Sequence, residues 1–245
     1  MAKSGRKTWI GLLVGFLVLV GLLVAADRGA AWAAEGQIAD QVAKKADQNK
    51  ITMQGEPEVT VEGIPFLTQV IGGEYQAVDI RMKEVSVDGV RLDSLDIRAT
   101  SVKASLSDLR SGTGEIRAAR VTGDATVGFG QVEELVGIDG AKVTGKNGKL
   151  LVRAPLKAGP VTITALATAD VKVSDGSIAI DVQKVTVADG ELPDYAQSVL
   201  DTYANSLSRK IPLPKLPYGL KVEGAKVTDA GVAATASAQD VPLSS

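Results

Sequence analysis

Residues 161–173, VTITALATADVKV, give the clearest alternation of apolar and polar side chains in this chain of 245 residues. Every odd-numbered position is Val, Ile or Ala, and every even-numbered position except Leu166 is Thr, Asp or Lys. Successive side chains of a β-strand point to opposite faces of the sheet. The segment therefore predicts a long strand with one buried face.

The alternation changes phase after a turn predicted at Asp175-Gly176. Ile178, Ile180 and Val182 occupy even positions, whereas Val185 and Val187 occupy odd ones. A slip of one residue is what a β-bulge produces. Similar slips separate the earlier apolar sets, which are Val78, Ile80 and Met82; Val85 and Val87; Leu92; Leu95, Ile97 and Ala99; and Val102, Ala104 and Leu106. Because repeated bulges bend a sheet, these strands predict a long, strongly bent antiparallel sheet.

Three segments have helical periodicity instead. Residues 27–50 are Ala-rich and lack Pro, residues 131–136 predict a short helix, and residues 192–207 carry an apolar stripe. The stripe consists of Leu192, Ala196, Val199, Leu200, Tyr203 and Leu207. It is typical of core packing, and the alternative is that it lines an apolar channel under the bent sheet. Together the patterns predict an α+β fold in which the sheet wraps around helices.

Turn and breaker residues divide the rest of the chain. Hairpins are expected at Asp88-Gly89, at Asn147-Gly148 and at residues 229–231. The Pro-rich segment 211–217 predicts an extended, stiff connector before a last hairpin at 218–241.

The amino terminus carries a membrane-targeting pattern. Seventeen uncharged residues, 10–26, follow the basic residues Lys3, Arg6 and Lys7. A helix of this length spans about 25 Å, between the length of a secretory signal and that of a full membrane span. Trp9 lies where an interfacial aromatic residue would anchor such a helix.

We expect an uncleaved signal anchor; the alternative is a signal peptide cleaved after the triplet Ala31-Trp32-Ala33. In either case positive charge stays in the cytoplasm, so the chain from about residue 35 lies outside the cytoplasmic membrane. The expected division is residues 1–34 as a basic stub with an anchor or signal peptide, and 35–245 as one extracytoplasmic domain.

Composition excludes several function classes. The chain has no Cys and no His, which removes thiol catalysis, disulfides, Ser-His-Asp triads and metal sites built on these residues. All 29 acidic residues follow residue 26, and the balance there is −5, which argues against binding to nucleic acid. No metal or cofactor is expected.

Candidate catalytic acids are few and unconvincing. Glu133-Glu134, or Asp93 with Asp96, are carboxylate pairs of the kind that glycosidases use, but no pattern places either pair in a cleft. Adjacent acids on a short helix are typical of a solvated face. The segment Gly128-Phe-Gly130 does not match a phosphate-binding loop. The sequence therefore predicts a protein that is not an enzyme.

Residues 61–75, VEGIPFLTQVIGGEY, with Asp27-Arg28 and Glu35 upstream, resemble the LmeA-like phospholipid-binding proteins of the actinobacterial cell envelope. The carboxyl end, with LPKLPYGL at 213–220 and AQDVPL at 238–243, is similar to the closing segment of that family. The resemblance covers nearly the whole chain. It implies an envelope lipid-binding protein that supports lipoglycan (lipomannan) maintenance, and a fold related to the tubular lipid-binding (TULIP) superfamily, in which a bent sheet and a long helix enclose an acyl-chain cavity.

The segment 61–75 has a simple physical interpretation. Gly63 allows a sharp exit from a strand, Pro65 starts a helical turn, and Gly72-Gly73 ends it. The apolar turn is either a gate that contacts acyl chains or a plug that closes one end of the core. The acyl-chain candidates are Phe66, Leu67, Val70, Ile71 and Tyr75, together with Val199, Leu200, Tyr203 and Leu207 of the striped helix.

Two basic runs are candidates for contact with a lipid headgroup or an anionic membrane surface. The first comprises Lys142, Lys146, Lys149, Arg153 and Lys157, and an ordinary solvated strand face explains it equally well. The second comprises Arg209, Lys210, Lys215 and Lys221, next to the striped helix. We favour the second as the headgroup set.

The leading hypothesis is a non-enzymatic phospholipid-binding protein that holds or shuttles acyl chains by burying them. Its expected partners are phospholipid, the cytoplasmic membrane and envelope glycan-synthesis proteins. The alternative is a membrane-anchored scaffold with a dry core that recruits envelope biosynthetic enzymes.

Overall fold

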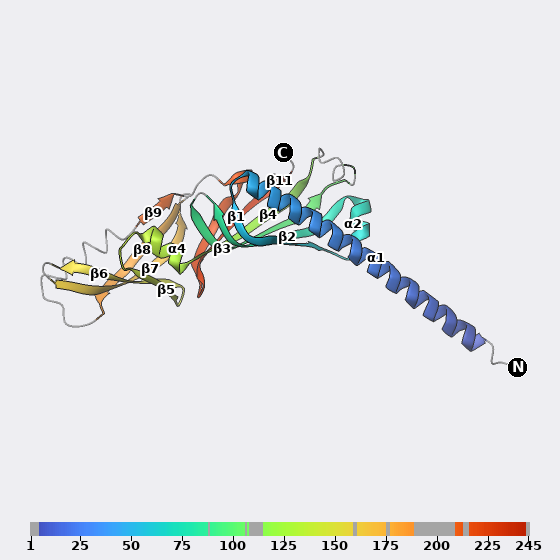
Figure 1. The fold of residues 1–245 in the computed structure, drawn as a ribbon, viewed down its shortest axis with the longest axis horizontal. Helices are drawn as coiled ribbons and strands as arrows, with labels where there is room; N and C mark the ends of the chain where they lie inside the picture. Colours follow the sequence, from blue (N-terminus) through green and yellow to red (C-terminus); the bar gives the residue numbers. More distant parts are fainter. Residues whose placement is uncertain are drawn as a thin grey trace.

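The computed structural model describes residues 5–87, 89–105, 107, 115–158, 161–174, 177–188, 209–212 and 216–243. Its helices are α1 (Gly5–Gln48), α2 (Phe66–Gly72) and α4 (Phe129–Val136), with a short 3₁₀ turn η1 (Pro217–Gly219). Most of the remaining described residues form antiparallel strands (Figure 1). The predicted α+β class is confirmed.

The strands are divided between two sheets. The first has the order β1-β2-β3-β4-β11-β10, with β1 (Thr52–Glu62), β2 (Glu74–Val87), β3 (Val90–Lys103), β4 (Arg117–Gly128), β10 (Lys221–Val227) and β11 (Gly231–Pro242). The second has the order β5-β6-β7-β8-β9, with β5 (Lys142–Lys146), β6 (Lys149–Ala158), β7 (Val161–Ser174), β8 (Ser177–Val187) and β9 (Arg209–Pro212). Within the described ranges neither sheet closes into a barrel.

The predicted bulges occur where the apolar pattern slips. Thr168 pairs with Lys184 while Ala169 pairs with Val182, which leaves Gln183 as the extra residue of β8. Glu84 in β2 and Ser101 in β3 have positive φ angles of 47° and 49°, at two of the other slips. These local distortions bend the strands.

The turn predictions are also confirmed where the structure describes them. Asn147 and Gly148, both with positive φ, join the paired residues Lys146 and Lys149, as a two-residue hairpin requires. Val227 pairs with Val232 around the turn at 228–231. Residues 211 and 212, predicted as the start of the Pro-rich connector, instead belong to the edge strand Arg209–Pro212, which pairs with β8. Pro212 is tolerated at the end of this edge strand, where no further ladder bond is needed.

Helix α1 combines the apolar run and the predicted helix 27–50 in one continuous helix. Side chains 14–26 are all exposed, and burial begins at Asp27. From there α1 crosses one face of the first sheet, as Figure 1 shows, and projects beyond it toward the amino terminus. The helix predicted at 131–136 is α4, and the helix predicted at 192–207 lies outside the described residues.

The two larger apolar clusters in the described part of the chain are called the proximal and the distal core. The proximal core lies between α1, α2 and the first sheet and contains Ala31, Val61, Phe66, Tyr75, Ala99, Val102, Ala104, Ala118, Val121 and Val241. The distal core joins the first sheet to α4 and the second sheet and contains Val132, Val143, Leu150, Ala169, Val171, Val227 and Val232. The first sheet therefore packs against a helix, as predicted. That helix is α1, in the part that follows the apolar run 10–26.

Candidate functional site

Helix α2 is short and has two different faces. Pro65 precedes it in extended conformation, and Gly73, with a positive φ of 67°, ends it by donating its N–H to the carbonyl oxygen of Gln69. Phe66 is buried in the proximal core, and Val70, one turn later, packs against the same cluster. Leu67 and Ile71 point outward and are exposed. The predicted apolar turn between glycines is confirmed as a short helix with apolar side chains on both its inner and its outer face.

The first turn of α1 beyond the apolar run holds α2 in place. The backbone N–H of Leu67 donates to Asp27 Oδ1 at 2.7 Å, and Arg28 Nη2 donates to the carbonyl oxygen of Gly63 at 3.4 Å. Asp27 is only 5% exposed, and the hydrogen bond from Leu67 is the main cause that lowers the pKa of this carboxyl. About two turns further along α1, Glu35 Oε1 accepts from the backbone N–H of Val61 at 2.9 Å.

Gln69 ties the other side of α2 to the sheet. Its Nε2 donates to the carbonyl oxygen of Glu62 at 3.1 Å, and its Oε1 accepts from the backbone N–H of Gln76 at 2.8 Å. The amide side chain lies so close to Gly63 that a Cβ there would approach Nε2 to 2.6 Å, and Gly63 also has a φ of 101°. The strand exit at this position therefore requires glycine.

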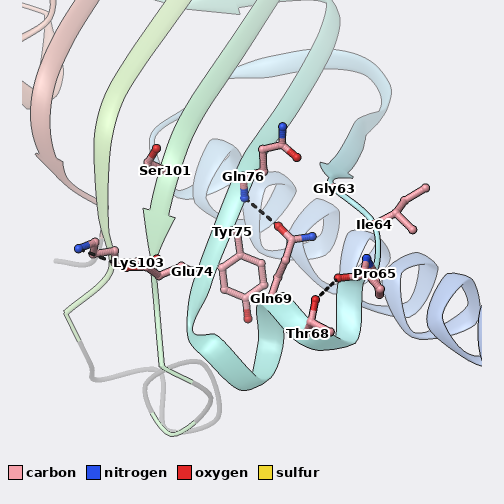
Figure 2. A pocket seen from close by; sticks show the side chains of 10 residues that line it. All are labelled: Gly63, Ile64, Pro65, Thr68, Gln69, Glu74, Tyr75, Gln76, Ser101 and Lys103. Atoms are coloured by element: carbon pink, nitrogen blue, oxygen red, sulfur yellow. Dashed lines mark hydrogen bonds and ion pairs between the residues drawn. The ribbon is translucent and has the colours of Figure 1, made fainter.

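An open hollow of about 540 Å³ lies beside α2, between it and the ends of β2 and β3 (Figure 2). It is lined by Gly63, Ile64, Pro65, Thr68, Gln69, Glu74, Tyr75, Gln76, Ser101 and Lys103. Most of these side chains can form hydrogen bonds. Lys103 Nζ lies 3.3 Å from Glu74 Oε1 in an exposed ion pair, the kind that contributes about 0–1 kcal/mol.

Tyr75 connects the hollow to the proximal core. Its ring centroid is 6.3 Å from that of Phe66, and the side chain is 8% exposed. Burial raises the pKa of the phenol. Among the described residues the Tyr75 hydroxyl is buried without a hydrogen-bond partner. A buried polar group without a partner costs about 1–3 kcal/mol.

The acyl-chain candidates therefore fall into two groups. Phe66, Val70 and Tyr75 meet in or against the proximal core, whereas Leu67 and Ile71 lie on the outer face of α2. Val199, Leu200, Tyr203 and Leu207 lie outside the described residues.

The headgroup candidates do not gather at this hollow. Arg209 and Lys210 belong to β9, which Figure 1 places at the opposite end of the molecule from α2. Lys221 is exposed at the start of β10, and Lys215 is outside the described residues. Sequence reasoning missed Lys103 and Ser101, although the phase slip between Ala99 and Val102 marked the distortion that carries Ser101.

The first basic run contains ordinary surface ion pairs. Lys142 Nζ lies 3.1 Å from Glu133 Oε2, and Lys149 Nζ lies 2.7 Å from Asp170 Oδ1. These contacts fit a solvated strand face.

The candidate catalytic acids have structural partners. Glu133 accepts from the backbone N–H of Val143 at 2.8 Å, which lowers the pKa of its carboxyl. Glu134 pairs with Arg91 at 2.8 Å, and Asp96 pairs with Arg81 at 2.7 Å. In the part of the chain that the structure describes, no three His, Cys, Asp or Glu residues are grouped to hold a metal ion.

Comparison with known proteins gives one finding. Residues 25–237 match the family described as LmeA-like phospholipid-binding, so the match begins two residues before Asp27 and includes α2 and the hollow. Neither the curated proteins nor the solved structures gave a match. Since the matched range covers most of the chain, the protein belongs to the LmeA-like phospholipid-binding family.

Proposed function

We propose that this protein binds one phospholipid at the hollow beside α2, with its acyl chains against the proximal core and α2 as the gate. The observation that carries the proposal is the buried, unpartnered hydroxyl of Tyr75 at the border between a polar hollow and an apolar cluster. An ester carbonyl of a glycerophospholipid accepts the hydrogen bond that this hydroxyl offers. Family membership supports phospholipid as the ligand class and a non-enzymatic role.

Apolar side chains around the proximal core supply the burial that acyl chains need. Val70, Val78, Ile97, Ile116 and Leu243 are partly buried and pack against the proximal core. Each methylene group removed from water contributes about 0.8 kcal/mol, so ten of them contribute about 8 kcal/mol before the costs of binding. Phe66 and Val70 of α2 pack in or against the proximal core, so a movement of α2 would open this core to a ligand.

The headgroup contact is assigned to Lys103, with Ser101 beside it in the lining of the hollow. An exposed ion pair with Glu74 is weak, so a lipid phosphate replaces it at little cost. The earlier headgroup set, Arg209, Lys210, Lys215 and Lys221, stays a prediction for contact with lipid headgroups or an anionic membrane surface.

The anchored form of the chain is favoured over the cleaved form. Among the described residues one helix, α1, is long and apolar enough to cross a membrane. Cleavage after Ala33 would remove Ala31 from the proximal core and Asp27 from α2.

The protein in this proposal is held at the extracytoplasmic face of the cell membrane by residues 10–26. There it holds or shuttles a phospholipid, or a phospholipid-anchored glycan precursor, and so supports lipoglycan maintenance together with glycan-synthesis proteins.

The test is photocrosslinking of the full chain in vesicles that contain a phospholipid with a diazirine at the end of one acyl chain, followed by mapping of the adducts by mass spectrometry. Binding predicts adducts on inward-facing residues such as Tyr75, Ile97 and Val102, besides those on residues 10–26. The variant Lys103→Ala lowers the inward yield, and the matched control Lys146→Ala, an exposed lysine of the β5-β6 hairpin, leaves it unchanged. Adducts confined to residues 10–26 would contradict the proposal and favour the scaffold with a dry core.

A further inference from the structure

Three large apolar side chains are exposed in the segment that contains α2, Leu67 and Ile71 within the helix and Ile64 two residues before it, and we call them the ridge. Ile64 is 79% exposed, Leu67 is 40% exposed and Ile71 is 87% exposed. Leu67 and Ile71 are four residues apart, so they lie one above the other on the same helical face. The whole segment from Gly63 to Gly73 carries no charged residue. A surface of this composition is suited to an apolar environment.

The ridge lies where the membrane-type part of α1 ends. Asp27, which accepts the hydrogen bond from Leu67 at 2.7 Å, is the first residue after the apolar run 10–26. Arg28 holds the carbonyl oxygen of Gly63, the neighbour of Ile64. Each residue advances a helix by about 1.5 Å, so the start of α2 is level with the end of the apolar run to within a few ångströms.

The bilayer is the occupant that this arrangement fits. Side chains 14–26 of α1 are exposed along every side of the helix, and a membrane that covers them reaches the level of Asp27. An apolar helix face at that level lies at the boundary between headgroups and acyl chains, where such faces bury about 5–10 Å deep.

We propose that Ile64, Leu67 and Ile71 insert into the leaflet from which α1 emerges, so that the hollow beside α2 opens directly onto the membrane. A phospholipid then reaches Tyr75 from the leaflet without crossing water. The inference rests on the anchoring role of α1 in the proposed function, and it does not require that the hollow be occupied.

The natural absence of cysteine makes a depth measurement possible with the full chain. In Ile71→Cys the new thiol carries an environment-sensitive fluorophore (NBD), and the protein is reconstituted in phosphatidylcholine and phosphatidylglycerol vesicles with or without doxyl-labelled acyl chains. Since Ile71 is exposed, the label does not disturb the core. The matched control is Asn147→Cys in the β5-β6 turn, which is exposed and belongs to the second sheet.

Insertion predicts blue-shifted emission at position 71 and quenching by doxyl lipid at least threefold stronger than at position 147. Equal, weak quenching at both positions, in proteins with the same circular dichroism spectrum, would overturn the inference. The two proposals fail separately. Crosslinks at Tyr75 without quenching at position 71 would support lipid binding and contradict the insertion of the ridge into the membrane. Quenching at position 71 without crosslinks at Tyr75 would support insertion and contradict lipid binding.

Discussion

Asp27 in α1 accepts a 2.7 Å hydrogen bond from the backbone amide of Leu67 in α2, a residue forty positions later in the chain. Pro65 at the start of α2 offers no side-chain cap of its own, so the carboxylate of α1 satisfies one of the free N–H groups of this helix. The orientation of α2 is thereby tied to α1.

Removal of this carboxylate should loosen α2. In Asp27→Ala we expect amide hydrogen exchange at Leu67 to become roughly tenfold faster, as for the loss of a helix cap, while exchange in β7 stays the same. Asp40→Ala is the matched control, because Asp40 is an exposed acid on the same helix. If the two variants exchange equally at Leu67, the hydrogen bond does not hold α2.

The same contact predicts a direction for pH dependence. The hydrogen bond from Leu67 lowers the pKa of Asp27 below its ordinary value of 3.8. Its contribution is therefore complete above that value and is lost as the pH falls through the lower pKa of the folded state. The amide shift of Leu67, followed by NMR, should stay native at pH 4 and change only in more acidic solution. In Asp27→Asn this acidic transition should be missing, and its persistence would assign it to another group.

Phe66 and Leu67 are neighbours in sequence with opposite surroundings, which allows a sharp stability test. Phe66 is buried in the proximal core, so Phe66→Ala should lower the free energy of unfolding by about 3–5 kcal/mol. Leu67→Ala, on the outer face, should change it by less than about 0.5 kcal/mol. Urea unfolding of the full chain in detergent, followed by circular dichroism, measures both. Equal effects would mean that α2 does not have a separate inner and outer face.

Local patterns predicted the elements of this fold better than their assembly. The bulge after Val182, the turn at Asn147-Gly148 and the ends of α2 depend on a few adjacent residues, so the sequence displays them directly. The division into two sheets depends on pairings such as Gly128 with Gly231, which are distant along the chain and have no local signal.

The site was predicted in part for the same reason. The motif at 61–75 correctly predicted α2. The hydrogen bonds from α2 to Asp27 and from Arg28 to Gly63 join residues that are distant in the sequence, so no local pattern predicts them. Lys103 is the single basic residue between Arg98 and Arg110, so a pattern of consecutive basic residues does not select it.

The hydroxyl of Tyr75 should matter for ligand and not for folding. Tyr75→Phe removes a buried donor without a partner, so the stability of the ligand-free protein should stay equal or rise by about 1 kcal/mol. Crosslinking of phospholipid to the inward-facing residues should fall about five- to tenfold, the size of one hydrogen bond. Tyr218→Phe, at an exposed tyrosine, should change neither quantity. An unchanged crosslinking yield in Tyr75→Phe would remove the hydroxyl from the site.

Residues 27–33 of α1, which follow the apolar run, should be needed for the thermal stability of the domain. A chain that starts at Asp27 keeps Ala31 in the proximal core and the carboxylate on Leu67, whereas a chain that starts at Ala34, as cleavage after Ala33 would leave it, loses both. Without residues 27–33, the proximal core also loses the packing of Ala30. The shorter chain should therefore melt at least 5 °C below the longer one, since about 1 kcal/mol shifts the midpoint of a domain of this size by 2–4 °C. Thermal unfolding followed by circular dichroism provides the comparison. Equal midpoints would show that residues 27–33 are dispensable for folding, and the processed form would then be compatible with the fold.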